Sequence, residues 1–339
     1  MLAVVMTEHG GPDVLRLMRT RVPEPRTPHD ALVRVLAAGV SPADSQARRR
    51  PLASHATEQL SGGLILGMEG AGVVEAVGRA VTRFGVGDEV YYLDGGFGLH
   101  QGNYGQYKVV DARYLARKPL SLSFSSAGAV PVALITAWEA LYDRAQVRVG
   151  DCALIHGDGD GGGVGHIAIQ LAHLRGARVA ATVSTHDNAA LARLLGAERT
   201  IRYRTEDVAT AVRRWTGREG VDVVFDIVDG TNFAASLDLV APYGTLVTCV
   251  VSPWPSGDNR MAEFKNIHIA FENIDLPQVS ADHTARLRQT QILEDAARLF
   301  DEGNLRVVVE RSYPLADAPK VHRALEAGEI IGRAVLEIP

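Results

Sequence analysis

The sequence predicts an α/β protein in which a doubly wound parallel sheet follows a β-rich segment. Up to about residue 125, short apolar runs are broken by glycine and proline, which is typical of a barrel-like or sandwich-like β domain. From residue 126, nearly all-apolar strand-like runs alternate with longer helical stretches, the pattern of a parallel sheet buried on both faces. A mixed pattern returns beyond about residue 275, which suggests that one domain is inserted into another.

The expected elements follow from these patterns in chain order. In the β-rich segment, strands are expected at residues 31–38, 72–77 and 89–92, the last one after a turn at residues 85–88. In the alternating segment, strands are expected at 152–156, 178–183, 221–226 and 244–250, with helices at 167–174 and 188–195. The last segment predicts a helix at 285–300, a strand at 305–309, a helix at 318–327 and a strand at 334–338.

Composition excludes several classes of protein. A length of 339 residues favours two domains, and 46% hydrophobic with 22% charged residues is ordinary for a globular protein. A net charge of −5 offers no basic footprint for nucleic acid. No apolar run approaches the roughly 18 residues that span a bilayer, and no signal-peptide pattern is present, so the cytoplasm is expected. Cys152 and Cys249 are expected to be free thiols in a reducing compartment.

The strongest local motif is the glycine-rich stretch at residues 156–165, between a strand pattern and a helix pattern. Two alignments to a dinucleotide-binding loop fit it. Gly157, Gly159 and Gly162 satisfy G-x-G-x-x-G, whereas Gly159, Gly162 and Gly165 are spaced three and three. We favour the second alignment, because the helix is expected to begin at Val164. The alternative is a merely flexible loop.

In such a loop, glycine lets the backbone approach a pyrophosphate, and the helix N-terminus supplies free N–H groups. Asp158 and Asp160 place two carboxylates beside that site. Because like charges repel, their side chains either point to solvent or weaken cofactor binding.

The end of the second strand indicates which nicotinamide cofactor binds. NAD-binding folds carry an acidic residue there for the ribose hydroxyls, but this chain has Ser184. Positive charge is available from His186, Arg202 and Arg204. These residues favour NADPH over NADH, although the two arginines would also suit a solvated surface.

Six blocks of sequence resemble the medium-chain dehydrogenase/reductases, and within them the quinone oxidoreductase branch. The match covers essentially the whole chain. The blocks are residues 37–44 (similar to A-G-V-N-P-x-D), 67–90 (G-x-E-x-A-G-V-V…V-G…V-G-D-x-V), 131–138 (P-x-x-x-L-T-A-aromatic), the glycine loop, 195–197 and 332–336.

This resemblance implies a Rossmann domain at residues 126–274, inserted into a GroES-like β-barrel catalytic domain formed by residues 1–125 and 275–339. It also implies a cleft between them that holds the active site, and a homodimer formed through the strand at 265–271. The cofactor-binding residues that it implies are Ser41, Thr136, Gly159, Gly162, Gly163, Val164, Gly165, Ser184, Asn188, Tyr203, Val250 and Arg333.

Two of these positions depart from or match the branch in informative ways. Asn188 stands where relatives commonly have a lysine near the 2′-phosphate. Loss of that lysine would weaken the preference for NADPH without restoring a preference for NADH. Tyr203 matches a tyrosine near the adenine end. Arg333 is a hypothetical phosphate contact.

Zinc is not expected. The positions that match the catalytic zinc ligands of related alcohol dehydrogenases hold Ser41, Met68 and Val132, which are poor ligands or none. A structural zinc lobe needs four cysteines, and the chain has two. Asp44 and Glu69 are then expected to be hydrogen-bonded structural groups.

Without zinc, an already activated acceptor is the expected substrate: a quinone or an α,β-unsaturated carbonyl, whose negative charge a hydrogen bond can stabilise. No catalytic residue can be assigned. Tyr92 and Tyr104 are candidate proton donors by spacing alone and fit packing roles better, His156 fits a satisfied core histidine, and water is an alternative source.

Two other functions compete with the quinone or enone reductase. An enoyl reductase acting on a thioester-bound intermediate would need a basic entrance, which the run at residues 48–50 could line unless it is a solvated loop. A non-catalytic nucleotide-binding scaffold or sensor would explain the substitutions at Ser41 and Asn188 and the Asp158–Asp160 loop.

Overall fold

The computed structural model describes all residues except 51–62, 97–99, 158–162, 229–231 and 250–259. The chain divides into two compact units: Met1–Val132 together with Asp275–Pro339, and Ala133–Ile274. The second unit holds a six-stranded parallel sheet, so the predicted α/β class with a doubly wound sheet is confirmed.

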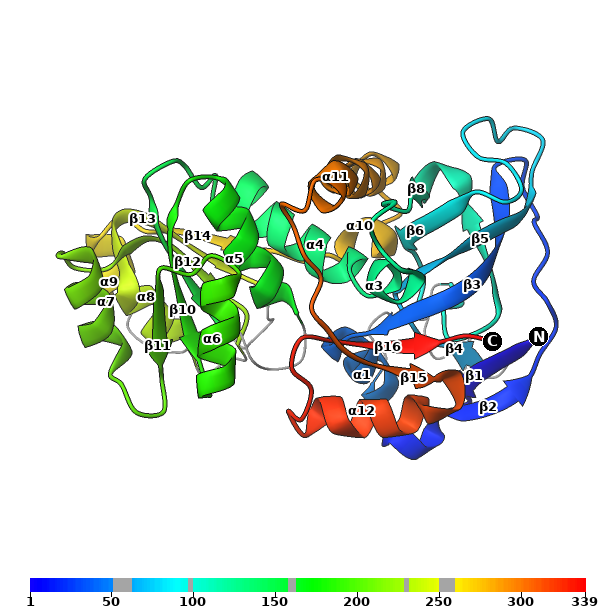
Figure 1. Ribbon diagram of the computed structural model, residues 1–339, viewed down its shortest axis with the longest axis horizontal. Helices are drawn as coiled ribbons and strands as arrows, with labels where there is room; N and C mark the ends of the chain where they lie inside the picture. Colours follow the sequence, from blue (N-terminus) through cyan, green and yellow to red (C-terminus); the bar gives the residue numbers. More distant parts are fainter. Residues whose placement is uncertain (51–62, 97–99, 158–162, 229–231, 250–259) are drawn as a thin grey trace. The chain divides into compact units, whose positions relative to one another are not determined.

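The sheet of the second unit has the order β11-β10-β9-β12-β13-β14, and its strands are buried in their central parts (Figure 1). The chain runs outward from β9 to β11 and then returns to β12 on the other side of β9, which opens a crevice at the carboxyl ends of these strands. The strands are β9 (Cys152–His156), β10 (Arg178–Val183), β11 (Arg199–Arg202), β12 (Val221–Asp226), β13 (Val240–Thr248) and β14 (His268–Phe271).

Helices cover both faces of this sheet. Figure 1 shows α5 (Val164–Leu174) and α6 (His186–Leu194) on one face. On the other face, α7 (Val208–Thr216), α8 (Phe233–Leu239) and α9 (Arg260–Phe264) pack into one apolar cluster with the strands. This burial on both faces is why the strands read as continuous apolar runs in the sequence.

The chain enters the second unit through α4 (Pro131–Trp138), which continues directly into a π-helix, η4 (Glu139–Arg144). Within the second unit, η4 packs against β13 and β14. A π-helix is rare and often marks a functional position.

The first unit is built on a seven-stranded sheet of order β15-β16-β3-β5-β6-β8, with β7 paired to β3, and on a three-stranded sheet of order β2-β1-β4. The last strand, β16, pairs with β3, which ties the end of the chain to its β-rich beginning. The strands are β1 (Leu2–Met6), β2 (Arg16–Arg19), β3 (Asp30–Val40), β4 (Leu64–Ile65), β5 (Glu69–Val77), β6 (Glu89–Leu93), β7 (Tyr107–Asp111), β8 (Ala116–Arg117), β15 (Val309–Pro314) and β16 (Arg333–Glu337).

The helices of the first unit are η1 (Pro12–Val14), α1 (Pro42–Arg49), η3 (Ala112–Tyr114), α3 (Phe124–Gly128), α10 (Leu276–Val279), α11 (His283–Asp301), η6 (Leu315–Asp317) and α12 (Ala318–Glu326). Because α3 packs on β3, β5 and β16, it belongs to the first unit. The units therefore divide at 132/133, whereas the sequence placed the boundary at 125/126. None of the helices in the described part of the chain is both long and apolar enough to cross a membrane.

Two expectations were wrong. The strand expected at 305–309 begins only at Val309, where pairing with β16 starts. Arg48 does not lie in a solvated loop or at an entrance: it is on α1, its side chain is fully buried, and it binds Glu326 on α12 and the carbonyl of Gly10. The guanidinium of Arg48 on α1 pairs with a carboxylate on α12, and a sequence pattern does not reveal such a pairing.

Candidate functional site

The turn after β9 requires glycine at position 157. Gly157 has φ of +110°, and a Cβ atom there would lie 2.5 Å from Cγ2 of Val228 in the loop after β12. Its N–H donates to Oγ1 of Thr182 on β10 at 3.1 Å. The chain thus passes closely between the ends of three adjacent strands, as a dinucleotide-binding turn must.

Helix α5 begins at Val164, as the sequence predicted, with Gly163 as its N-cap residue at φ of +68°. Gly163 has no side chain with which to cap this end of the helix. Its first N–H groups and its positive dipole end therefore suit an anion such as a pyrophosphate. Gly165 lies in the first turn of the helix. Gly159, Gly162, Asp158 and Asp160 lie outside the described residues, so the choice between the two alignments and the direction of the two carboxylates stay predictions.

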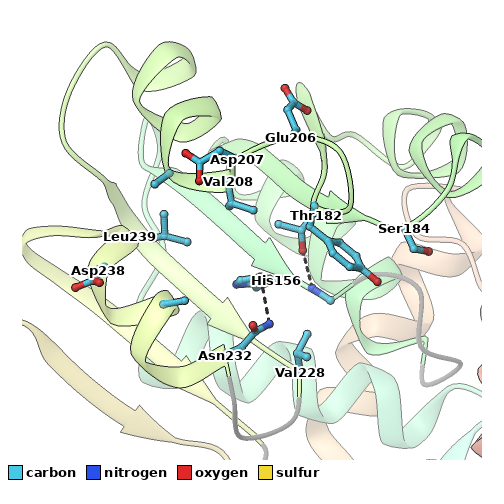
Figure 2. Close-up of a pocket in the computed structure, with 14 residues that line it drawn as sticks. His156, Thr182, Ser184, Glu206, Asp207, Val208, Val228, Asn232, Asp238 and Leu239 are labelled. Carbon is cyan, nitrogen blue, oxygen red and sulfur yellow. Dashed lines mark hydrogen bonds between the residues drawn. The ribbon is translucent and has the colours of Figure 1, made fainter. Parts of the chain in front are cut away.

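A cavity of about 580 Å³ lies in the second unit beside this turn (Figure 2). Residues from the ends of β9 and β10, from the start of α7 and from α8 surround it. It brings Ser184 and Tyr203 together, both of which the resemblance implied as cofactor-binding residues. The lining residues are His156, Gly157, Thr182, Ser184, Tyr203, Glu206, Asp207, Val208, Ala209, Val228, Asn232, Ala235, Asp238 and Leu239.

Ser184 follows β10 directly and is held by Asn188. The Asn188 side-chain amide donates to Oγ of Ser184 at 3.1 Å, so the serine hydroxyl proton stays available for another acceptor. Asn188 is itself fixed in the first turn of α6, where its N–H donates to Thr185. Two residues that the resemblance implied as cofactor-binding therefore contact each other.

Two carboxylates that line the cavity, Glu206 and Asp207, have partners. Glu206 binds Arg199, and Asp207 caps α7 by accepting from the N–H of Thr210 at 2.8 Å. Arg202 donates to Nε2 of His186 at 2.9 Å. This last pair places positive charge in the segment after β10, where the sequence favoured a phosphate.

His156 lines the cavity and is held in place by a chain of hydrogen bonds. Asn232 donates to Nε2 of His156 at 3.3 Å (Figure 2). On the other side of the ring, Nδ1 contacts Oγ of Ser236 at 3.2 Å, and Ser236 donates to Asp226 at 2.7 Å. Burial lowers the pKa of His156, so the ring is neutral at physiological pH. The expectation of a satisfied core histidine is confirmed, and its two side-chain partners, Asn232 and Ser236, were not found from the sequence.

Acidic groups and a thiol follow the next strands of the sheet. Burial raises the pKa of Asp226 at the end of β12. It raises the pKa of Cys249, after β13, to about 12, with Asp226 and Glu272 adding to the shift. Burial and the neighbouring Glu139 raise the pKa of Glu272, after β14, to about 9. Both cysteines are free thiols, as expected.

We expect Glu272→Gln to change how stability depends on pH. The folded protein keeps a proton on Glu272 up to a pKa of about 9, whereas an unfolded glutamate loses it near 4.5. The folded state binds more protons between these values, so Glu272 makes stability fall as pH rises through that window. Glutamine removes this pH dependence. The difference in free energy of unfolding between the variant and the unmodified protein should therefore shift by about 1–3 kcal/mol in favour of the variant from pH 5 to pH 8. Urea unfolding at both pH values measures it.

The exposed Glu263→Gln is the matched control for that comparison and should leave the pH profile unchanged. A Glu272→Gln profile parallel to that of the unmodified protein would show that Glu272 is already ionised at neutral pH.

In the first unit, Ser41 and Asp44 form a capping box on α1. The backbone N–H and the hydroxyl of Ser41 both donate to Oδ2 of Asp44 at 2.8 Å. The Ser41 hydroxyl also lies 3.6 Å from the sulfur of Met68. Asp44 is therefore the hydrogen-bonded structural group that the sequence predicted, and the implied cofactor contact of Ser41 stays a prediction.

Arg333 and Glu69 form a buried ion pair. The guanidinium binds Glu69 and donates to the carbonyl of Ala129 at 2.6 Å, while Glu69 also accepts from the N–H of Val132 at 2.7 Å. Arg333 is only 2% exposed. A phosphate contact by Arg333 would require this pair to open, and that contact stays a prediction.

The remaining implied residues give no candidate acid. Tyr92 and Tyr104 are fully buried packing residues of the first unit, as expected; the hydroxyl of Tyr104 lies 3.3 Å from Nε2 of His322. Thr136 is buried on α4, and Val250 lies outside the described residues. Among the residues that the structure describes, no group of three or more His, Cys, Asp or Glu side chains is placed to hold a metal ion.

Comparisons with known proteins decide the family. The model of the alcohol dehydrogenase GroES-like domain matches residues 27–120, and that of the zinc-binding dehydrogenase matches 195–336. The quinone oxidoreductase of Pseudomonas aeruginosa is 33% identical over 331 residues, which are 97% of each chain. The chain belongs to the medium-chain dehydrogenase/reductase superfamily. Within it, the chain falls in the quinone oxidoreductase-like branch.

Other relatives of this medium-chain dehydrogenase/reductase differ in size. The 2-haloacrylate reductase of a Burkholderia species is 31% identical over 340 residues, covering 99% of this chain and 98% of that one. The phthioceranic/hydroxyphthioceranic acid synthase of Mycobacterium tuberculosis is 37% identical over 275 residues, or 81% of this chain. The chain spans only 12% of the length of that synthase.

A solved structure agrees with the fold over the whole length. Quinone oxidoreductase of Escherichia coli complexed with NADPH superposes with a TM-score of 0.85 at 26% identity, covering 99% of this chain and 100% of that one. The glycine turn, the start of α5 at a glycine N-cap and the adjoining cavity fit the nicotinamide cofactor of this superfamily.

Proposed function

We propose that this oxidoreductase uses NADPH to reduce quinones or α,β-unsaturated carbonyls, by direct hydride transfer and without zinc. The observation that carries the proposal is the cavity at the end of β10, where Ser184 stands in place of an acid. The quinone oxidoreductase and 2-haloacrylate reductase relatives support an activated acceptor.

Preference for NADPH rests on charge at the end of β10. A carboxylate there would bind the ribose hydroxyls of NADH and repel a 2′-phosphate, and Ser184 does neither. Its hydroxyl, oriented by Asn188, can donate to a phosphate oxygen, and the Arg202–His186 pair supplies positive charge nearby.

Independence from zinc rests on the side chains at the ligand positions. Ser41 and Met68 lie side by side, with oxygen and sulfur 3.6 Å apart, and the Ser41 hydroxyl is committed to Asp44. A neutral hydroxyl, a thioether and the Val132 side chain make a poor donor set for Zn²⁺. The bound cofactor supplies the hydride, and the protein binds and orients it.

Binding and turnover test this proposal separately. Quenching of the fluorescence of Trp138, Trp215 and Trp254 is titrated with NADPH and with NADH. Loss of reduced-cofactor absorbance is followed with a panel of quinones and enones. We expect NADPH to bind about 10-fold or more tightly than NADH, a difference of about 1.4 kcal/mol. Tighter NADH binding would overturn the cofactor assignment, and binding of neither would favour the non-catalytic scaffold.

A second candidate is reduction of an enoyl group held on a thioester. The 37% identity over 275 residues to a phthioceranic/hydroxyphthioceranic acid synthase favours it. Rates with a free enone and with the matching acyl thioester distinguish the two reductases: a thioester preferred by a large factor would move the proposal to this substrate class.

We further propose a cytoplasmic homodimer formed through β14. This strand is the last in the order of the sheet, and large apolar side chains near it are exposed: Tyr243 at 81%, Phe264 at 83% and Phe271 at 54%. An open strand edge with apolar neighbours is a ready surface for a second copy. The molar mass in solution tests it, since a monomer would have 36.4 kDa.

A further inference from the structure

Strand β2 leaves one edge of the three-stranded sheet open in the described part of the chain, because it is the outer strand of the order β2-β1-β4 (Figure 1). It runs antiparallel to β1, with Leu17 opposite Val4 and Arg19 opposite Leu2. The N–H groups of Leu2 and Val4 donate to residues 104–106 on the far side of β1, at 2.7 and 2.8 Å. In an antiparallel ladder, both residues of such a pair direct their backbone groups away from each other. The N–H and C=O groups of Leu17 and Arg19 therefore face the open edge, where another strand could pair with them.

The segment that forms this edge is basic, although the chain as a whole is not. Four arginines and a single acid, Glu24, lie within residues 16–26, which gives a local charge of +3 in a chain of net charge −5. The nearest acid before this segment, Asp13, is paired with Arg323. The four arginines are Arg16, Arg19, Arg21 and Arg26. In the part of the chain that the structure describes, their side chains are exposed and form no ion pair, so this surface attracts a negatively charged partner.

All four residues of β2 are exposed, in the order charged, apolar, apolar, charged. Leu17 and Met18 are each 45% exposed, and they lie between Arg16 and Arg19. Side chains directly opposite each other on paired strands interact, and opposite charges there stabilise the pair. Charged side chains at an open edge also exclude strands of the same charge. The strand that fits this edge therefore carries acidic, apolar, apolar and acidic residues in turn.

We propose that β2 binds an extended acidic segment of a partner protein as an added antiparallel strand, with acidic residues opposite Arg16 and Arg19 and two apolar residues between them. The backbone groups of Leu17 and Arg19 provide affinity, and the two arginines select an acidic sequence. The second apolar residue of the bound segment lies opposite Leu17 and donates its N–H to the carbonyl of Leu17, whereas the first directs its N–H away from β2. This surface lies within the first unit, and the inference does not depend on the cofactor or the substrate of the proposed function.

The test titrates fluorescein-labelled peptides with the full chain and follows their fluorescence anisotropy. A peptide with the core Glu-Val-Val-Glu should bind at least about 10-fold more tightly than one with the core Lys-Val-Val-Lys, which brings like charges together. An N-methyl group on the second valine removes the N–H that donates to Leu17 and should weaken binding by about 10-fold or more. The same group on the first valine is the matched control. Because that N–H points away from β2, it should change the dissociation constant by less than about 3-fold.

Charge reversal on the protein tests the same surface from the other side. The double variant Arg16→Glu with Arg19→Glu should lose binding of the acidic peptide and gain binding of the lysine peptide, each by about 10-fold or more. Arg79→Glu with Arg214→Glu changes the net charge equally at two exposed arginines elsewhere and should keep the original preference.

Equal binding of the two cores by the unmodified protein, or equal effects of the two N-methyl groups, would overturn the proposal. Phosphatidylserine vesicles provide a further arm. If they bind the unmodified protein but not the Arg16→Glu, Arg19→Glu variant, while the acidic peptide shows no preference, the basic edge serves an anionic membrane surface instead.

Discussion

Ser184→Asp is expected to reverse the cofactor preference, weakening NADPH binding by about 100-fold relative to NADH. The aspartate would stand at the end of β10, in the wall of the cavity that also holds Tyr203. There a carboxylate accepts from the ribose hydroxyls of NADH and faces the 2′-phosphate of NADPH as a like charge. Such a juxtaposition costs several kcal/mol, enough for a change of this size. Tryptophan quenching with both cofactors measures the ratio.

Ser184→Asn provides the matched control, because it adds a side chain of the same shape without charge. It should weaken NADPH binding by less than about 10-fold, and the difference between the two variants isolates the charge. Should the aspartate variant keep the original ratio of NADPH to NADH affinity, the 2′-position of the ribose would not lie at the end of β10. The Arg202–His186 pair would then have no part in cofactor choice.

The central strands were predictable because burial on both faces leaves them continuously apolar. The expected strands at 178–183 and 221–226 coincide with β10 and β12, and the helix expected at 188–195 differs from α6 by one or two residues at each end. The start of α5 at Val164 was predictable for a different, local reason: glycine is unfavourable inside a helix, so the glycines before Val164 lie outside it.

Groups that act through distant partners were not predictable. Asn232 and Ser236 meet His156 from 76 and 80 residues away, and only the packing of α8 on the sheet brings them there. Arg48 sits in a run of three arginines that is typical of an exposed loop, yet it pairs with Glu326, 278 residues away. A sequence pattern carries no information on such pairs.

Glu272 illustrates the same limit at the candidate site. A glutamate just after a short strand at the edge of a sheet suggests a solvated strand end. Its burial depends on the π-helix η4, which brings Glu139 and Arg144 against β14. Neither the unusual helix nor the pairing has a local signature, so the burial of this carboxyl group was not predicted from the sequence.

Breaking the buried pair between Glu69 and Arg333 is expected to have the largest effect on stability. Burial lowers the pKa of Arg333 to about 10, with Asp44 opposing the shift, so the guanidinium stays charged at neutral pH. Glu69→Gln would leave that charge buried without its carboxylate. Loss of one partner of a buried pair costs about 3–5 kcal/mol, because the remaining charge is desolvated and uncompensated. Urea unfolding at pH 7 measures the loss.

Two further variants decide what such a loss means. Glu75→Gln breaks the Arg34–Glu75 pair, whose side chains are 40% and 39% exposed, and should cost no more than about 1 kcal/mol. The double variant Glu69→Gln with Arg333→Met removes both charges and should be more stable than Glu69→Gln alone, since no buried charge is left unpaired. If Glu69→Gln costs as little as Glu75→Gln, Arg333 is not held by this pair and is available for the phosphate contact that the sequence suggested. A large loss that the double variant partly restores would instead assign Arg333 to the core of the first unit.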